Sequence, residues 1–445
     1  MTENKNFFKD KKITVMGLGL LGRGLGVIKF LANQGALLTV TDLKTEAELK
    51  PSLVKLARYK NIQYVLGRHR LGDFKKADLI IRAPNAPLNS PYLQAAQKAK
   101  VPIEMDASLF AKLAPAGVKL IGITGSRGKS TVTHLLFDIL KQAKKRVHLG
   151  GNVRGLVTLP LLNKVKSGDL VVLELDSWQL QGFGQNKISP QMAIFTSFMA
   201  DHLNYYQGNL RRYFKDKSQI YRFQKPEDVL ITGGTAKEAI LKYGPQPKSK
   251  ILKPQLQLTK NWPLTVLGKH TRYNMTLATT AAMELGVPKT VIRRVVKNWT
   301  GLPGRLEPVE TTKGVKYIND TTATTPQALA AAIKAWSVDR NKIILIAGGQ
   351  DARLDWSEID KDLKKIKVIV LFPGTATDIL IKKLPKHLQD QAQVVDNMKE
   401  AVNKAKDKAG IGDVVLLSPG AKSFGLFKNE FDRGDQFKYY VRKLK

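Results

Sequence analysis

The sequence predicts an α/β protein of three domains with mostly parallel sheets. Short apolar, β-branched runs alternate with helical patterns from one end of the chain to the other, as strands do when crossover helices connect them. The length of 445 residues exceeds one typical hydrophobic core. Two glycine-rich turns, each between an apolar run and a helical pattern, indicate ligand sites at strand ends.

The predicted strands fall into three groups that are separated by two breaks. One break lies near residues 106–112, and the other near residues 301–304, where GLPG interrupts a helical stretch. The breaks predict domains at residues 1–106, 107–303 and 304–445. Strands are expected at residues 13–16, 37–41, 79–81, 120–124, 170–175, 192–196, 229–232, 315–318, 343–346, 368–371 and 414–417.

The first glycine-rich turn follows the first expected strand. Its spacing is Gly17-x-Gly19-x-x-Gly22, and Asp42 ends the second strand twenty residues after Gly22. This dinucleotide-binding fingerprint predicts a diphosphate at a helix N-terminus, with an acidic group nearby. By itself it would indicate NAD, although it reports a diphosphate-binding turn and not a particular nucleotide. A purely structural tight turn is the alternative.

The second turn, GITGSRGKST at residues 122–131, joins an expected strand to a helical pattern at residues 132–140. Glycines let backbone N–H groups approach phosphate oxygens, Lys129 can reach the terminal phosphates, and the Ser130 hydroxyl can hold Mg²⁺. The common spacing has glycine where this chain has Ile123. A chance match is the alternative, but the coincidence of strand, loop and helix favours a nucleoside triphosphate site.

Acidic, imidazole and amide side chains of the same domain are candidates for a magnesium–nucleotide site. Glu174 ends a strand at the edge where ligands bind in parallel sheets, and it is the candidate metal ligand. Asp201 and His202 follow the next strand and form a possible second pair, although such a pair in a loop is more often solvated. Asn274 begins an alanine-rich helix, where its amide could hydrogen-bond a purine edge.

The last predicted domain contains three loops that follow strands, at residues 318–326, 347–353 and 418–437. They are rich in glycine, hydroxyl and charged residues, and each could be ordinary turn chemistry. Because all three follow strands, they together predict a further ligand site.

Composition excludes several classes of protein. No apolar stretch reaches the ~18 residues that a membrane span needs, and the polar N-terminus lacks the apolar core of a signal peptide, so a cytoplasmic protein without membrane insertion is expected. The absence of cysteine excludes disulfides, thiolate metal sites and a cysteine nucleophile. The formal charge of +36 fits anionic small substrates with a general lysine bias better than a nucleic-acid surface, because the lysines are scattered.

These motifs, in this order and across essentially the whole chain, resemble the Mur ligase family. The blocks are GLGLLGRG, GITGSRGKSTVTHL, GGNVRG, LELDSWQL, DHLN, GKHTRYN, GLPGRLE, YIND and LLSPGAKSFGLFKNEFDRG. The resemblance is strongest to the branch that uses ATP to add glutamate to UDP-N-acetylmuramoyl-L-alanine in peptidoglycan precursor synthesis. It implies a Rossmann-like N-terminal domain for UDP, a central ATPase domain, and a Rossmann-like C-terminal domain for the amino acid that closes during turnover.

The resemblance also implies the residues that bind each ligand. For the UDP substrate they are Gly19, Leu20, Leu21, Gly22, Asp42, Lys44 and Asn152. For ATP they are Gly125, Ser126, Arg127, Gly128, Lys129, Ser130, Thr131, Asn274, Arg305 and Asp320. For the amino acid they are Thr324, Arg353, Lys422, Ser423 and Phe424. For the cofactor Mg²⁺ they are Ser130, Glu174, His202 and Lys217, where Lys217 aligns with a lysine that is carbamylated in the family.

The implied catalytic residues are Lys129, Glu174, His202 and Lys217. In the implied reaction the γ-phosphate of ATP passes to the L-alanyl carboxylate, the amine of glutamate attacks the acyl phosphate, and phosphate leaves. Positioning and charge neutralisation carry most of this chemistry. No nucleophilic side chain is needed, which agrees with the absence of cysteine.

The chain departs from the family pattern where the acceptor amino acid is expected. Thr322 and Ala352 stand where many glutamate-adding members have lysine, and Gly304 replaces a histidine. Arg353 or Lys422 could supply the missing cation, since arginine can bind a carboxylate bidentately. D-Glutamate is therefore the favoured acceptor, and the variant that adds L-glutamate is the alternative.

Three further hypotheses stay open at this stage. Another Mur ligase or a folylpolyglutamate synthase-like enzyme would usually lack the first turn in this form. An NAD-dependent dehydrogenase leaves the second turn unexplained. A nucleic-acid-binding ATPase would use the +36 charge and would show strongly salt-dependent binding. The favoured interpretation is a monomeric ligase whose partners are its small-molecule substrates and that binds no nucleic acid.

Overall fold

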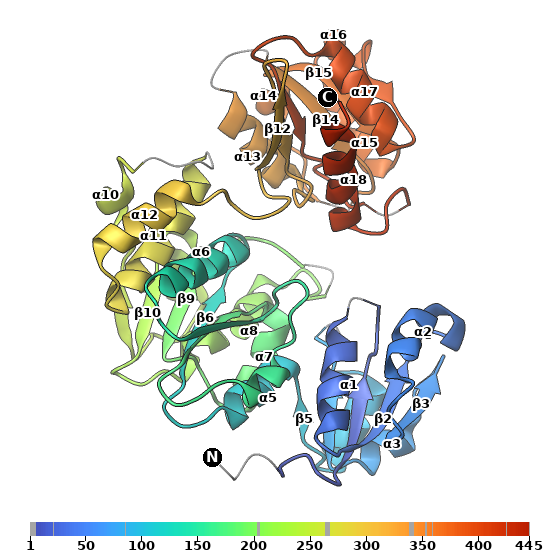
Figure 1. Ribbon diagram of the computed structural model, residues 1–445, viewed down its shortest axis with the longest axis vertical. Coiled ribbons are helices and arrows are strands. Elements are labelled where there is room, and N and C mark those ends of the chain that lie inside the picture. Colours follow the sequence, from blue (N-terminus) through green and yellow to red (C-terminus); the bar gives the residue numbers. More distant parts are fainter. Residues whose placement is uncertain are drawn as a thin grey trace. The chain divides into compact units, whose positions relative to one another are not determined.

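The computed structural model describes residues 6–20, 22–84, 86–202, 205–262, 268–337, 342–351, 354–357, 359–423 and 425–444. These residues form three sheets with helices packed against them (Figure 1). The chain divides into two compact units, Met1–Leu258 with Asn274–Ile292, and Thr259–Tyr273 with Arg293–Lys445. The first unit contains two sheets and the second contains one, which confirms the predicted three-domain α/β architecture.

The first sheet has the strand order β3-β2-β1-β4-β5, and every neighbouring pair is parallel. Its strands are β1 (Lys12–Met16), β2 (Leu37–Asp42), β3 (Ile62–Leu66), β4 (Leu79–Arg82) and β5 (Ile103–Glu104). Its helices are α1 (Arg23–Asn33), α2 (Glu46–Leu53), η1 (Val54–Leu56), α3 (Leu71–Lys75) and α4 (Pro91–Lys98). Strands β2 and β3 lie on one side of β1, and β4 and β5 lie on the other. The strand order therefore reverses at β1, and the carboxyl ends of β1 and β4 border the crevice in which such sheets bind ligands.

The second sheet has the order β11-β10-β9-β6-β8-β7, again entirely parallel. Its strands are β6 (Lys119–Thr124), β7 (Val147–Gly151), β8 (Leu170–Glu174), β9 (Met192–Phe195), β10 (Val229–Thr232) and β11 (Lys250–Leu252). The helices are α5 (Asp106–Leu113), α6 (Lys129–Gln142), η2 (Leu159–Asn163), α7 (Ser177–Gln185), α8 (Leu210–Arg222), α9 (Gly234–Tyr243) and α10 (Leu256–Thr259), followed by α11 (Lys269–Glu284) and α12 (Lys289–Asn298), which contribute to both units. Because β6 lies between β8 and β9, the loops after all three strands meet at one edge.

The third sheet has the order β12-β13-β17-β14-β15-β16. Its strands are β12 (Glu307–Thr312), β13 (Val315–Asn319), β14 (Ile343–Gly348), β15 (Ile366–Phe372), β16 (Gln393–Val394) and β17 (Val414–Leu417). The β12–β13 pair is antiparallel and the other pairs are parallel. The helices are α13 (Pro326–Trp336), α14 (Asp360–Leu363), α15 (Thr375–Lys383), α16 (Lys386–Gln389), α17 (Met398–Lys408) and α18 (Glu430–Arg442).

All of the strands that the sequence predicts are present, and the strands that it misses are the two edge strands of each sheet. These are β3 and β5, β7 and β11, and β12 and β16. Interior strands such as β6 are buried along nearly their whole length, whereas β11 and β12 have no fully buried position. A continuous apolar run therefore identifies interior strands, and a half-exposed edge strand lacks that signal.

The two sheets of the first unit share one hydrophobic core. Buried apolar side chains form a continuous cluster from α1, with Val27 and Leu31, to η2, with Leu159. A carboxylate also joins α5 to η2, because Asp106 at the start of α5 accepts hydrogen bonds from the backbone N–H groups of Thr158 (3.0 Å) and Leu159 (2.6 Å). The boundary predicted at residue 106 thus falls in a well-packed region. Within the described ranges, no helix is long and apolar enough to cross a bilayer.

Two glycines of the β7–η2 connection allow a test of how closely β7 and β8 approach. Gly151 and Gly155 both have positive φ, at 82° and 74°. A Cβ on Gly151 would lie 2.1 Å from the carbonyl oxygen of Glu174, whereas a Cβ on Gly155 would meet no atom within 4 Å.

We expect Gly151→Ala to lower the thermal unfolding midpoint much more than Gly155→Ala does. The left-handed backbone costs an alanine about 1–2 kcal/mol at either position. Only Gly151→Ala adds a collision with backbone that cannot move aside, so the matched pair isolates the steric effect. Equal midpoints for the two variants would contradict the close approach of residue 151 to β8.

Candidate active site

The glycine-rich loop between β6 and α6 has the geometry of an anion cradle. Gly125 and Gly128 adopt φ values of 151° and 86°, a backbone conformation that residues with a side chain rarely adopt. Gly128 caps α6 without any side-chain hydrogen bond, so the first N–H groups of the helix stay available to a ligand. The predicted strand, loop and helix are therefore present, with α6 beginning at Lys129.

Glu174 lies beside this helix start because β8 pairs with β6. The register places Ile123 opposite Glu174, and the Ser130 hydroxyl donates to Oε1 of Glu174 at 3.0 Å. Glu174 is only 4% exposed. A hydroxyl and a carboxylate oxygen thus meet at the N-terminus of α6, as the sequence predicts for a magnesium site.

The extension of β9 fixes the other side of the loop. The backbone N–H of Ser126 donates to the carbonyl oxygen of Ser197 (2.8 Å), and that of Arg127 donates to the Ser197 hydroxyl (2.9 Å). The Ser126 hydroxyl donates to the carbonyl of Met199 (2.9 Å) and lies 3.2 Å from the phenolic oxygen of Tyr213. With both sides held, the loop is shaped before any ligand arrives.

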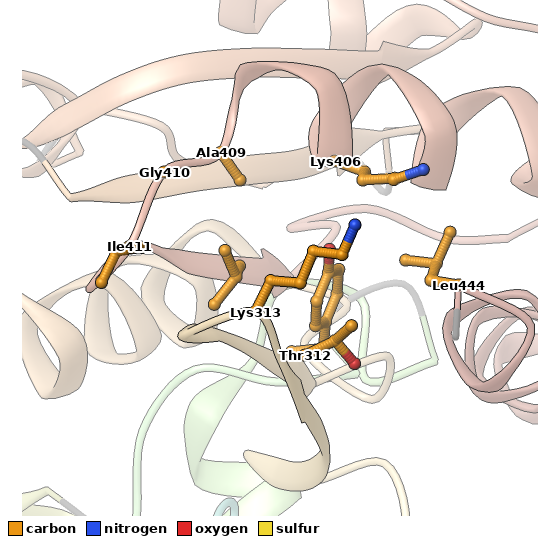
Figure 2. A pocket seen from close by; sticks show the side chains of 9 residues that line it. Thr312, Lys313, Lys406, Ala409, Gly410, Ile411 and Leu444 are labelled. Carbon is orange, nitrogen blue, oxygen red and sulfur yellow. The ribbon is translucent and has the colours of Figure 1, made fainter.

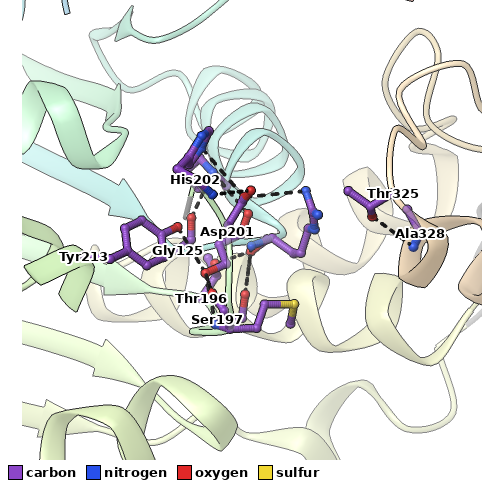
Figure 3. Close-up of polar contacts among 12 residues, drawn as sticks. Gly125, Thr196, Ser197, Asp201, His202, Tyr213, Thr325 and Ala328 are labelled. Atoms are coloured by element: carbon purple, nitrogen blue, oxygen red, sulfur yellow. Dashed lines mark hydrogen bonds and ion pairs between the residues drawn. The ribbon is translucent and has the colours of Figure 1, made fainter. Parts of the chain in front are cut away.

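Asp201 and His202 follow β9 and lie next to the loop (Figure 3). The Asp201 carboxylate is 3.8 Å from the Arg127 guanidinium and 3.7 Å from Nε2 of His202. Burial lowers the pKa of His202 against the opposing effect of Asp201, which favours the neutral imidazole. The His202 ring packs against Trp178 at 4.7 Å between centroids, and its φ of 53° is unusual for a non-glycine residue.

Two lysines, the half-buried Lys129 and the buried Lys217, meet at the carbonyl oxygen of Gly125. Nζ of Lys129 and Nζ of Lys217 each donate to it at 2.9 Å. Burial lowers the pKa of both side chains, and for Lys217 the positive charge of Lys129 lowers it further. Lys217, 1% exposed, comes from α8, so residues far apart in the sequence converge at this loop.

Asn274 lies against the end of the same loop. A Cβ on Gly128 would be 2.4 Å from the Asn274 side-chain oxygen, which leaves room only for glycine there. Asn274 belongs to α11 and is 9% exposed. The structure thus places Asn274 beside the predicted phosphate loop.

In the first sheet, Asp42 organises the glycine-rich turn itself. Its Oδ2 accepts from the backbone N–H groups of Leu18 and Gly19, both at 2.9 Å, and its Oδ1 accepts from the N–H of Lys44 at 3.0 Å. Gly22 caps α1 with φ of 90° and without a side-chain hydrogen bond. The turn therefore presents a helix N-terminus to the crevice, while the fingerprint carboxylate holds the chain in shape.

The remaining residues predicted for the UDP substrate differ in their surroundings. Leu20, at the tip of the turn, is 51% exposed, and Lys44 forms an exposed ion pair with Glu48 at 3.3 Å. Asn152 accepts a hydrogen bond from the Arg23 guanidinium at 2.8 Å, which ties the β7 loop to α1. Leu21 lies outside the described residues.

In the third sheet, the loops after β13, β14 and β17 meet because these strands are neighbours. The N–H of Gly420 donates to the carbonyl of Ala323 (2.8 Å), and the backbones of Gln350 and Lys422 are hydrogen-bonded in both directions (3.1 and 2.9 Å). The Arg433 guanidinium also joins two of the loops, donating to the carbonyls of Thr321 (2.9 Å) and Ala421 (3.3 Å). The loops that the sequence singles out therefore form one cluster.

The predicted ligand residues of this cluster are in varied states. Asp320 is buried, and its carboxylate accepts from the N–H of Leu306 (3.1 Å) and the hydroxyl of Ser418 (3.0 Å). Arg305 is exposed, Thr324 and Lys422 are half-buried, and Ser423 is buried. Arg353, Phe424 and also Ala352 lie outside the described residues.

Two departures from the family pattern are in contact. The backbone N–H and the hydroxyl of Thr322 both donate to the carbonyl of Gly304, at 3.1 and 2.9 Å. Gly304 has φ of 73°, and a Cβ there would lie 2.8 Å from Cγ2 of Thr321. A larger side chain at position 304 would therefore need the neighbouring threonines to move.

A groove of the second unit lies at the opposite ends of these strands (Figure 2). Lys313 and Thr312 precede β13, and Ile411 precedes β17, whereas the loop cluster follows both strands. Lys406 and Leu444 complete this side of the groove. The groove is therefore separate from the loops predicted to bind the amino acid.

Sequence reasoning identified the residues that lie within motifs and missed those that reach the site from elsewhere. Tyr213 contacts Ser126 from α8, and Arg82 and Gln181 join the two sheets of the first unit. None of these three belongs to a glycine-rich or acidic motif. Only the pairing of distant elements reveals them.

Comparison with known proteins assigns most of the chain to three related family profiles. Residues 11–104 match the Mur ligase MurD-like N-terminal domain, residues 123–282 the Mur ligase middle domain, and residues 304–420 the Mur ligase glutamate ligase domain. UDP-N-acetylmuramoylalanine–D-glutamate ligase of Roseiflexus sp. is 36% identical over 468 residues and covers 98% of this chain and 99% of its own length. The protein of the same name in Borreliella afzelii is 35% identical, with 98% of each chain covered.

Solved structures show the same fold at lower sequence identity. UDP-N-acetylmuramate-alanine ligase MurC of Thermotoga maritima has a TM-score of 0.63 and 18% identity, and it covers 98% of this chain and 100% of its own. MurF ligase of the same organism, solved in complex with ADP, has a TM-score of 0.57 and 16% identity, covering 99% and 97%. At these identities the likeness concerns the fold.

The buried Asp320 predicts a specific pH dependence of stability. Burial raises its pKa to about 7, against its hydrogen bonds from Ser418 and Leu306 and the charge of Arg305. Between the unfolded value of about 3.9 and this pKa, the folded state binds more protons than the unfolded state. The contribution of Asp320 to folding therefore falls as pH rises from about 4 to about 7.

We expect Asp320→Asn to remove this dependence. The difference in thermal midpoint between the wild type and the variant should change in favour of the variant between pH 4 and 7, and it should level off above pH 8. Midpoint differences that are constant over this range would show that Asp320 ionises alike in both states.

Proposed function

This chain belongs to the Mur ligase family, and from that premise we propose that it is the ATP-dependent ligase that joins glutamate to UDP-N-acetylmuramoyl-L-alanine. The acceptor that we favour is D-glutamate, and the reaction is a step of cytoplasmic peptidoglycan precursor synthesis. The support is full-length similarity to proteins named UDP-N-acetylmuramoylalanine–D-glutamate ligase, at 36% and 35% identity.

The single structural observation that supports phosphoryl transfer is the site at the start of α6. Lys129, Ser130 and Glu174 meet there at the N-terminus of α6. In the proposed reaction the γ-phosphate passes to the L-alanyl carboxylate, because a free carboxylate has no adequate leaving group. The amine of glutamate then attacks the acyl phosphate, an amide forms, and phosphate leaves. Lys129 and the loop N–H groups neutralise the transferring phosphoryl group.

The same site fits Mg²⁺. Ser130 and Glu174 offer a hydroxyl and a carboxylate oxygen 3.0 Å apart, and Mg²⁺ prefers such hard oxygen ligands. Among the residues that the structure describes, there is no group of three acidic or histidine side chains that could hold a metal ion. This agrees with a magnesium ion held by one or two carboxylates together with substrate phosphates. Bound Mg²⁺ would supply charge neutralisation of the phosphate oxygens.

Lys217 is suited to the carbamylation that the resemblance implies. A neutral amine is the form that adds to CO₂, giving a carbamate and a proton, and burial beside Lys129 favours the neutral amine of Lys217. Carbamylation would turn one of the two desolvated amines that donate to the Gly125 carbonyl, that of Lys217, into an anion. It would also add oxygen ligands on the side of the loop opposite Glu174.

His202 is the proposed side chain for a second metal position or for accepting a proton from the incoming ammonium. Its lowered pKa favours the neutral imidazole, which both roles require. Asp201 lies close enough to orient the ring, at 3.7 Å. The carboxyl-terminal loop cluster, with Thr324, Lys422 and Ser423, is proposed to receive the amino acid, and Arg353 or Lys422 to provide the cation for its side-chain carboxylate.

The identity of the acceptor is tested by product formation. Purified protein with Mg²⁺, ATP and UDP-N-acetylmuramoyl-L-alanine receives D-glutamate, L-glutamate or neither, and phosphate release and product mass are measured. We expect a UDP-dipeptide and stoichiometric phosphate with D-glutamate only. A dipeptide with L-glutamate would identify the variant ligase, and no dipeptide with either would overturn the proposed function.

Lys129→Ala is expected to lower turnover by about 10³-fold, since one lost donor to a transferring group costs roughly 10²–10³-fold and here a full charge is lost. Lys129 donates to two loop carbonyls, at 2.9 and 3.4 Å, and Lys217 still donates to one of them when Lys129 is removed. The thermal midpoint should therefore change little. Lys141→Ala, at the exposed end of the same helix, is the control and should keep wild-type turnover. Wild-type turnover by Lys129→Ala would sink the assignment of this loop.

A further inference from the structure

Arg82 occupies the ligand-binding edge of the first sheet although no motif includes it. It ends β4, and the parallel register places it opposite Met16, the residue just before the glycine-rich turn. Arg82 thus lies at the switch point between β1 and β4, where the order of the strands reverses. Arg82 is 2% exposed, so its charge is almost fully removed from water.

Among the residues that the structure describes, no carboxylate forms an ion pair with the guanidinium of Arg82. One amino group donates to the carbonyl of Ala86 (2.7 Å), and the other donates to Oε1 of Gln181 (2.7 Å). Its Nε is buried without a hydrogen-bond partner among the described residues. A buried cation is costly unless an anion compensates it. The nearest compensation comes through Gln181.

Gln181, on α7, connects this cation to the half-buried carboxyl group of Asp216. Its Nε2 donates to Oδ2 of Asp216 at 2.7 Å, while its Oε1 accepts from Arg82. The hydroxyl of Tyr206 donates to the same Asp216 oxygen at 2.9 Å. The amide dipole is therefore aligned between a positive and a negative group, a chain in which each hydrogen bond strengthens the next.

Asp216 is adjacent in sequence to Lys217, and both lie on α8. Asp216 fixes α8 toward Gln181, and Lys217 fixes it toward the carbonyl of Gly125, at 2.9 Å, and the hydroxyl of Thr124, at 3.4 Å. The position of the Lys217 amine thus depends on contacts on both sides of the helix. Arg82, Gln181 and Asp216 form a hydrogen-bonded chain, here called the relay. The relay leads through α8 and Lys217 to the phosphate loop.

We propose that Arg82 is a positioning residue of the reaction, which through Gln181 and Asp216 holds the turn of α8 that presents Lys217 to the phosphate loop. The inference rests on the proposed function and deepens it, because it links the edge that is proposed to bind UDP with the site of phosphoryl transfer. The continuous core of the first unit supports it, since the two sheets then move together.

The test compares Arg82→Met, which keeps length and removes charge, with Asp216→Asn, which keeps an acceptor and removes the anion. Arg58→Met, at an exposed position in the turn between η1 and β3, is the matched control. For each variant we would measure kcat, the KM of every substrate, the half-saturating Mg²⁺ concentration, the affinity for Mg–ADP by calorimetry, and the thermal midpoint.

We expect Arg82→Met to lower kcat by about 10-fold or more, because misplacing a catalytic group by an ångström can cost about 100-fold. The half-saturating Mg²⁺ concentration should rise and the Mg–ADP affinity should fall, although Arg82 lies in the other sheet. The loss in the double variant should be smaller than the product of the two single losses, since both break one network. Arg58→Met should leave all of these values unchanged.

Two results would overturn the inference. A raised KM for the UDP substrate with unchanged kcat and Mg²⁺ dependence would make Arg82 a ligand of that substrate only. A lower thermal midpoint with wild-type kinetics would make it merely structural. If Arg82→Met does not fold, Gln181→Glu provides the same test, because it keeps an acceptor for Arg82 and removes the donor to Asp216.

These measurements distinguish failure of the relay from failure of the proposed function. A wild-type protein that forms no UDP-dipeptide would overturn the proposed function, and the Mg–ADP affinities of the variants would still decide the relay. A wild-type protein that forms the dipeptide, with Arg82→Met equal to it in every measurement, would overturn the relay and leave the proposed function in place.

Discussion

The carbonyl oxygen of Gly125 is the point on which the central site depends. It accepts from two lysines, the half-buried Lys129 and the buried Lys217, at 2.9 Å each, so two amines share one neutral acceptor. Such an arrangement is costly by itself, and the lowered pKa of each amine expresses that cost. Anions at the loop would relieve it. The proposed phosphoryl transfer would bring such anions, the phosphate oxygens of ATP, to this point.

The sequence predicts a structural feature when the residues that form it lie in one continuous segment. The interior strands, both glycine-rich turns and Glu174 were predicted correctly in position, because each lies in a continuous run of apolar or glycine-rich residues. The edge strands were missed, since half-exposed strands carry no such run. The roles of individual ligand residues stay predictions. Contacts such as that of Gln181 with Asp216 could not be predicted, because they join α7 to α8 through side chains that no spacing identifies.

The departures from the family pattern become easier to understand once their neighbours are known. Thr322 donates twice to the carbonyl of Gly304, and the space beside Gly304 is filled by Thr321. A histidine at position 304 would need both threonines to move. Gly304, Thr321 and Thr322 therefore pack as one unit after β13. In the proposed function the cation for the acceptor comes from another loop of the cluster, of which Lys422 is a half-buried member.

The first glycine-rich turn shows why its fingerprint reports a shape more directly than a nucleotide. Both oxygens of Asp42 are used by backbone N–H groups of Leu18, Gly19 and Lys44, so the acidic residue holds the turn and the second strand end together. A rigid turn then leaves the choice of nucleotide to side chains around the crevice. Arg82 stands opposite that turn but is directed into the protein, toward Gln181. In the proposed relay the charge at this edge acts inward, on α8, and the turn with the exposed residues beside it stays the predicted contact of the ligand.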